Sequence, residues 1–223
     1  MIAHVLRYSG SMPLPVRDSE LVQIMDAALS DVSHRAGQWL ACRPGCTQCC
    51  HGVFSINALD AARIQSGRKA LEISDPDTAQ AISTRARSWL EQYGPDFPGN
   101  LATGMLGQSE ADQDRFEDFA NDAPCPALNP QTGLCDIYAW RPMTCRVFGP
   151  PVRVTEGDGL ACCELCFVGA TDEQIAACEM HLPHEFESEI LAETGDSDET
   201  IVAFALLRKA TESPRSDSPE PLR

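Results

Sequence analysis

The chain has 223 residues and a formal net charge of −16 at pH 7. This length fits a single domain with tails, and it allows a hydrophobic core to form without covalent cross-links. The negative charge argues against general binding to nucleic acids, because the chain repels phosphate backbones. The odd number of cysteines, 11, excludes complete disulfide pairing within one chain.

Targeting and membrane segments are not expected from the sequence. Residues 1–10 lack the run of about 7–15 apolar residues that a signal peptide needs. No stretch approaches the roughly 18 apolar residues of a membrane span. We therefore expect a cytoplasmic protein without membrane contact. In that reducing compartment, clustered cysteines favour metal or redox roles over structural disulfides.

Apolar residues at helical spacing predict a mainly α-helical small domain. The first helix is expected to begin at Asp18 or Ser19, either of which can cap it, and to continue to Leu40. A second helix is expected after the capping residue Asn57, with its end near Gly67.

The helical pattern continues beyond these two segments. Residues 76–93 follow Asp75 as a cap, and a less regular helical stretch is expected across residues 105–119. A capping box at 171–174 predicts a helix that includes Cys178, and a last helix is expected over residues 197–209.

The domain organisation is expected to be simple. Residues 1–17 are predicted to form a flexible N-terminal arm, residues 18–211 one cysteine-cluster domain, and the proline- and serine-containing residues 212–223 a disordered tail. Residues 121–170 are rich in proline and glycine, so regular structure is expected to be short there. A metal centre would order such a segment.

Ten of the cysteines fall in two blocks that define the candidate metal ligands. The first block holds Cys42, Cys46, Cys49 and Cys50, and the second holds Cys125, Cys135, Cys145, Cys162, Cys163 and Cys166. Thiolates at this density suit a soft metal ion or an iron–sulfur cluster. The sequence thus predicts a loop-rich, cysteine-ligated centre that holds either an iron–sulfur cluster or Zn²⁺.

The spacing between Cys46 and Cys49 is the usual one for two ligands of one ion. We expect this pair to share a site with Cys125, Cys135 and Cys145, so that the two blocks meet. A thioredoxin-like dithiol uses the same spacing, but the neighbouring cysteines and the lack of a βαβ pattern argue against it.

Two pairs of adjacent cysteines leave the number of sites open. Successive side chains diverge, so one member of each pair is expected to bind while the other packs, unless they serve two neighbouring centres.

The remaining cysteine, Cys178, is predicted to be a core residue. His51 follows the first block and is interpreted as a neighbour of the site or a surface residue, with His181 and His184 weaker candidates still.

Two arginines lie among the cysteines, against the overall charge of the chain. Guanidinium groups at Arg141 and Arg146 would offset the charge of a tetrathiolate centre and donate hydrogen bonds to sulfur. Ordinary surface arginine is the alternative. The aromatic residues Tyr138, Trp140 and Phe148 are interpreted as groups that exclude water from the centre, as core packing, or as both.

The cysteine pattern also resembles a known family. The resemblance is carried by Cys46-Thr-Gln-Cys49-Cys50-His-Gly and by Cys125-Pro126, Gly133, Cys135, Ile137-Tyr138, Arg141-Pro142, Cys145-Arg146 and Phe148. Across roughly residues 42–166 the chain resembles the cysteine-cluster family often called YkgJ, a zinc- or iron-chelating domain. Flagellin lysine methylases look like larger relatives, for which an iron–sulfur cluster is the implied cofactor. This chain is much shorter, and no Gly-rich loop after a strand is evident for S-adenosylmethionine.

Three functions remain open at this point. The leading hypothesis is a protein that binds a metal ion or a cluster; the sequence identifies no protein partner. The alternatives are a cluster-dependent enzyme, either methylase-like or redox, and a thiol–disulfide protein without metal.

Overall fold

The computed structural model describes residues 14–153 and 159–208. The predicted tail and nearly all of the predicted N-terminal arm lie outside these residues. The fold is mainly α-helical, as the sequence predicts. Within the described residues, no helix is both long enough and apolar enough to cross a membrane.

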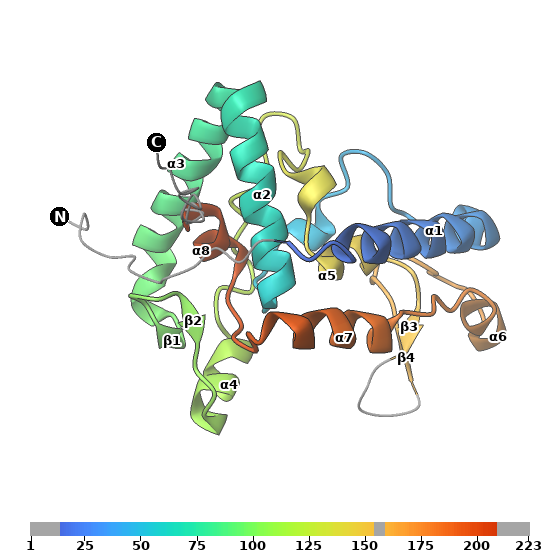
Figure 1. Ribbon diagram of the computed structural model, residues 1–223. Helices are drawn as coiled ribbons and strands as arrows, with labels where there is room; N and C mark the ends of the chain where they lie inside the picture. Colours follow the sequence, from blue (N-terminus) through green and yellow to red (C-terminus); the bar gives the residue numbers. More distant parts are fainter. Residues whose placement is uncertain (1–13, 154–158, 209–223) are drawn as a thin grey trace, which may run out of the picture.

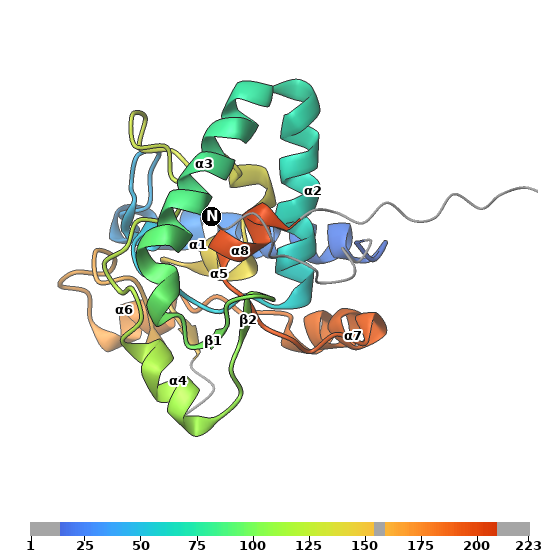
Figure 2. The ribbon, with the colours of Figure 1, turned by 90° about the vertical axis from the view of Figure 1, so that its left-hand side faces the viewer.

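Two long helices form an antiparallel pair at one side of the molecule. Helix α2 (Ala58–Ser74) and helix α3 (Pro76–Tyr93) lie side by side in both views (Figures 1 and 2). The short helix α8 (Val202–Leu207) packs against both. Their apolar faces bury a cluster that includes Ile64 and Ile82. Burial of this cluster, more than intrinsic helix propensity, stabilises the pair.

A second core surrounds the first helix. Helix α1 (Asp18–Ala36) contacts the five-residue helix α5 (Met143–Val147) and helix α7 (His184–Thr194). Its buried residues Leu21 and Val32 pack in one cluster with Ile190 of α7. Cys163, Cys166 and Cys178 belong to the same cluster.

The remaining elements are short and lie mostly in the connections. They are the 3₁₀ turns η1 (Gly37–Trp39), η2 (Gln48–Cys50), η3 (Gly94–Asp96) and η4 (Tyr138–Trp140), the helices α4 (Glu110–Glu117) and α6 (Asp172–Ala176), and the strands β1 (Gly99–Asn100), β2 (Met105–Leu106), β3 (Val152–Arg153) and β4 (Leu160–Ala161). The strands form two antiparallel pairs, β1 with β2 and β3 with β4. Short elements between residues 121 and 170 agree with the proline-rich sequence there.

Several helix starts follow the predicted capping chemistry. The Asn57 side chain accepts a hydrogen bond from the Asp60 N–H at 3.0 Å, and the Asp75 side chain accepts one from the Thr78 N–H at 3.1 Å. The capping box that opens α6 at Thr171 is also present. Local polar side chains thus satisfy the first N–H groups of three helices.

Two predictions about helix ends are wrong. Neither Asp18 nor Ser19 caps α1, because the cap position is Arg17 and the Asp18 carboxylate is buried against Arg63. Gly67 does not end α2, which continues to Ser74. A Cβ at Gly67 would stand 2.4 Å from the Trp140 ring, so this glycine allows the ring to approach the helix.

Other differences concern segments with weak periodicity. Residues 105–106 form a strand, although the sequence predicts a helical stretch there. Helix α6 ends at Ala176, before Cys178, and the last helix begins at Val202, later than residue 197. Helix α7 is not predicted by the sequence at all. It carries a single fully buried residue, Ile190, and its start has no side-chain cap.

Candidate metal centre

Backbone hydrogen bonds bring the two cysteine blocks together. The Cys125 N–H donates to the Cys50 carbonyl at 2.7 Å, which joins the end of the first block to the start of the second. The Cys163 N–H donates to the Gly149 carbonyl at 3.2 Å. A Cβ at Gly149 would stand 2.6 Å from the Cys42 sulfur, so only glycine, here at φ +131°, lets this segment pass so close to Cys42.

Four thiols interact around the end of the second block, and the charge of Cys166 also acts on the exposed Cys162 beside them. We call them the first thiol group: Cys42, Cys46, Cys163 and Cys166. Cys166 is central, because it accepts hydrogen bonds from the thiols of both Cys42 and Cys163. The charge of Cys46 acts on the same two thiols. Burial, followed by the charge and hydrogen bond of Cys166, raises the pKa of Cys42 to about 12.

Five further thiols interact with one another. We call them the second thiol group: Cys49, Cys50, Cys125, Cys135 and Cys145. The Cys50 thiol donates a hydrogen bond to the Cys49 sulfur. This bond lowers the pKa of Cys49 and raises that of Cys50, so Cys49 is the more acidic thiol of the pair.

The other members of the second thiol group are half-buried, and the pKa of each thiol is raised. Burial raises the pKa of Cys125 to about 12, and it is the main cause of the raised pKa of Cys135. Burial also raises the pKa of Cys145, and the charges of Cys125, Cys49 and Cys135 act in the same direction. Thiolates crowded in this way repel one another unless a cation lies among them.

Backbone N–H groups point at several of these sulfurs. The donors lie two or three residues after the cysteine: Ala127 and Leu128 to Cys125, Ile137 to Cys135, and Leu165 to Cys163. Such bonds stabilise thiolate, the form in which cysteine binds a metal. The donors serve both thiol groups.

The donor set fits a soft cation or a cluster. Each group offers at least four thiols, the number that a tetrahedral zinc site or a four-iron cluster takes. Within residues 14–153 and 159–208, no three Cys, His, Asp or Glu side chains have the arrangement of a formed metal site. The two groups are therefore defined by which thiols interact, and not by a coordination geometry.

The single site predicted from Cys46, Cys49, Cys125, Cys135 and Cys145 stays a prediction. The charge of Cys46 acts on the pKa of Cys42 and Cys163, whereas the charge of Cys49 acts on the pKa of Cys145. The adjacent cysteines Cys49 and Cys50 are hydrogen bonded within one group, although neighbouring side chains were expected to take different roles. Cys162 and Cys163 do diverge, because Cys163 is buried while Cys162 is exposed.

The two arginines behave differently from each other. The positive charge of Arg141 lowers the pKa of Cys49 and of Cys135, which places it within electrostatic reach of the second thiol group. Arg146 is buried, but its Nη1 donates to Asp26 of α1 at 2.7 Å and its Nη2 to the Ala139 carbonyl. It therefore ties α5 to α1.

Other candidate residues have structural or surface positions. Cys178 is 6 % exposed and packs in the core, as predicted. His51 is exposed, and its Nδ1 lies 3.0 Å from the Thr47 carbonyl, while its charge acts on Cys49. Tyr138 and Phe148 are 63 % and 42 % exposed, so neither is a core residue.

A buried ionic network, which the sequence does not reveal, holds the start of helix α5, and α5 carries Cys145. Arg63 of α2 donates to Asp18 from Nε and Nη2 and also pairs with Asp60. The Asp60 carboxylate accepts the Met143 N–H at 2.9 Å, which caps the start of α5 from a different helix. Because α5 carries Cys145, this network fixes one member of the second thiol group.

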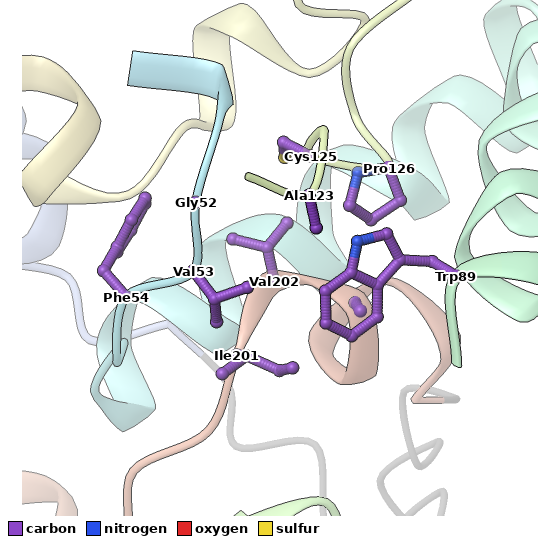
Figure 3. Close-up of a pocket in the computed structure, with 10 residues that line it drawn as sticks. Gly52, Val53, Phe54, Trp89, Ala123, Cys125, Pro126, Ile201 and Val202 are labelled. Carbon is purple, nitrogen blue, oxygen red and sulfur yellow. The ribbon is translucent and has the colours of Figure 1, made fainter. Parts of the chain in front are cut away.

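A small apolar cavity adjoins the same group. Figure 3 shows Trp89, Val53 and Ile201 around it, with Cys125 at its edge. Its volume of about 20 Å³ accommodates roughly one water molecule. The indole N–H of Trp89 has no hydrogen-bond partner among the described residues, and a water there would supply one. The cavity is too small for an organic substrate.

The fold and the thiol groups together define a small helical domain built around clustered cysteines. Residues 41–166 match the CxxCxxCC family, described as "Putative zinc- or iron-chelating domain". The match covers more than half of the chain, and the protein belongs to this family. No curated protein and no solved structure matches the chain. The further resemblance to flagellin lysine methylases stays a prediction.

Proposed function

We propose that the protein binds metal at two separate centres, one in each thiol group. The observation that carries this proposal is the division of nine cysteines between two sets of interacting thiols. Cys163 and Cys166 of the first group pack in the core around α1, whereas Cys125 and Cys135 of the second pack against the core of α2, α3 and α8. Each group therefore has its own hydrophobic surroundings.

The electrostatics support metal as the natural occupant. Burial, and after it the charges of neighbouring thiols, raises the pKa of Cys42, Cys125 and Cys145, so forming thiolates here without a cation is unfavourable. A bound cation removes the cost, because it stabilises the thiolate form of every ligand. The all-thiol donor set suits iron–sulfur clusters or Zn²⁺. All eleven cysteines are free thiols, which accords with a reducing compartment such as the cytoplasm.

Elemental analysis of protein purified without oxygen tests the proposal directly. We expect iron or zinc in an amount that corresponds to two filled centres in each chain. Visible absorption distinguishes the two metals, because iron–sulfur clusters are coloured and zinc thiolates are not. A folded protein that contains no metal after anaerobic purification would overturn the proposal.

The five thiols of the second group predict redundancy. We expect that Cys49→Ser and Cys50→Ser singly leave metal at this centre, because four thiols remain in each variant. The double variant is expected to lose this metal and to keep the metal of the first group. Metal content per chain, measured for the three variants side by side, checks this prediction. Complete loss in either single variant would show that both thiols are required.

A further inference from the structure

Phe167 has an unusual backbone conformation directly after the central thiol of the first thiol group. Its φ angle is 55°, in the left-handed region that residues with side chains rarely adopt. Within the part of the chain that the structure describes, Ala120 is the only other non-glycine residue with a positive φ. For a bulky residue this conformation is an outlier that the surrounding contacts must maintain, and such outliers are concentrated at ligand sites.

Two contacts hold Phe167 in the left-handed conformation. The residue is only 4 % exposed, and its ring packs in the hydrophobic cluster around α1. Its backbone N–H donates to the Trp39 carbonyl at 2.8 Å. A change to a negative φ would turn the ring relative to the N–H, so one of the two contacts would break. Burial of the ring and the hydrogen bond therefore offset the cost of the left-handed backbone.

The hydrogen bond to Trp39 joins two segments that carry members of the first thiol group. Cys166 directly precedes Phe167, and the Cys166 N–H donates to the Cys163 carbonyl at 2.8 Å, which closes a turn between these two cysteines. Trp39 lies three residues before Cys42. The turn with Cys163 and Cys166 is therefore tied, at Phe167, to the segment that leads into Cys42.

We propose that Phe167 is a positioning residue of the first thiol group, whose left-handed backbone, held by the buried ring, keeps the Cys166 sulfur against the Cys42 and Cys163 thiols. Both of these thiols donate hydrogen bonds to Cys166. Phe167 itself supplies no metal ligand. Where it concerns metal, the inference rests on the proposed function, but the positions of the three thiols depend on protein contacts alone.

Glycine and alanine at position 167 separate the effect of the backbone from that of the ring. Phe167→Gly and Phe167→Ala both remove the ring, but only glycine takes a positive φ without a steric cost. We expect Phe167→Gly to bind Zn²⁺ at the first thiol group about ten-fold more tightly than Phe167→Ala, because alanine carries the cost of a left-handed residue. Zinc at the second thiol group should be bound equally by both.

Competition with a chelator measures the zinc affinities of the full-length variants. Loss of a buried ring destabilises both proteins, so a variant can be unfolded without metal. In that case the Zn²⁺ concentration that restores the helical circular dichroism ranks the two variants in the same way, because metal binding and folding are coupled.

Val168 provides the matched control, because it is the next residue in the chain and its φ is not positive. It is 71 % exposed, so its side chain contributes little to the core. Val168→Gly is expected to bind zinc no more tightly than Val168→Ala, since glycine has no conformational advantage there. The advantage of glycine over alanine should therefore be specific to position 167.

Alkylation of Cys166 tests the positioning role without metal. N-ethylmaleimide is added to the reduced, metal-free proteins, and mass spectrometry gives the rate at each cysteine. We expect Cys166 to react at least about five-fold faster in Phe167→Ala than in Phe167→Gly, because relaxation of the alanine backbone moves the Cys166 sulfur away from the other thiols. Cys178 lies in the same cluster and is 6 % exposed, so it reports general loosening of the core and should react equally in both.

The two measurements also separate this inference from the proposed function. If Phe167→Ala equals or exceeds Phe167→Gly in zinc affinity or in protection of Cys166, the backbone at position 167 does not position the thiol and the inference is wrong. A parent protein that binds no zinc at the first thiol group would contradict the proposed function instead. The alkylation rates would then still decide whether Phe167 positions Cys166.

Discussion

Replacement of Cys166 by serine is expected to remove the metal of the first thiol group and to lower stability by more than about 4 kcal/mol. Cys166 accepts hydrogen bonds from both Cys42 and Cys163, so it lies at the centre of the group. The group has four thiols, with only the exposed Cys162 beside them, and three thiolates do not close a tetrahedral site. Binding energy at such a site is also folding energy, because the unfolded chain does not hold the site together.

Cys178→Ser is the matched control for this variant. Cys178 is 6 % exposed and Cys166 is 4 % exposed, and both belong to the same hydrophobic cluster. Serine at position 178 places a hydroxyl in the core, at a cost of about 1–3 kcal/mol, but leaves the thiol group intact. Metal per chain and melting temperature, measured for both proteins prepared without oxygen, separate the two effects. Equal metal loss in the two variants would place Cys178 in the centre and refute our assignment.

The helical hairpin could be predicted because its signals are local. The caps Asn57 and Asp75 act within three residues of their own position, and the apolar spacing of residues 76–93 is regular. Helix α7 lacks both signals. Its start at His184 follows Pro183 without a side-chain cap, and acidic residues occupy much of its length. It is ordered by contacts with α1 and α2, which the local sequence does not encode.

The composition of the metal centre was only partly predictable. Cysteine density identified the region, but the spacing of Cys46 and Cys49 describes only how close two residues are along the chain. Which group a sulfur joins depends on cysteines more than 70 residues away in the chain. Cys50 interacts with Cys125, and Cys46 interacts with Cys163.

Buried charges are the hardest feature to read from the sequence. Asp18 and Arg63 occupy helical positions where charged residues usually face solvent. Their pairing joins the start of α1 to α2 across 45 residues of chain, and Asp60 extends the link to the start of α5. Burial raises the pKa of Asp60 to about 6 even though the charge of Arg63 lowers it, which indicates how strongly this site depends on its cation.

Removal of that cation is expected to have the second large effect. Arg63→Ala would leave the Asp18 and Asp60 carboxylates buried without a counter-charge, since all three side chains are less than 10 % exposed. Breaking a buried ion pair from one side costs roughly 3–5 kcal/mol, or about 6–20 °C in melting temperature for a chain of this size. Metal at the second thiol group should also fall, because Asp60 holds the start of the helix that carries Cys145.

Arg68→Ala on the same helix provides the comparison. Arg68 pairs with Glu72 one turn later, and the Glu72 side chain is 49 % exposed, so this pair is worth only about 0.3–0.5 kcal/mol. Both variants replace an arginine of α2 by alanine. They differ in whether the acidic partners of that arginine are buried or exposed. Thermal unfolding and metal content of both proteins check the prediction. If Arg63→Ala melts within a degree or two of Arg68→Ala and retains full metal, the buried network neither stabilises the fold nor positions Cys145.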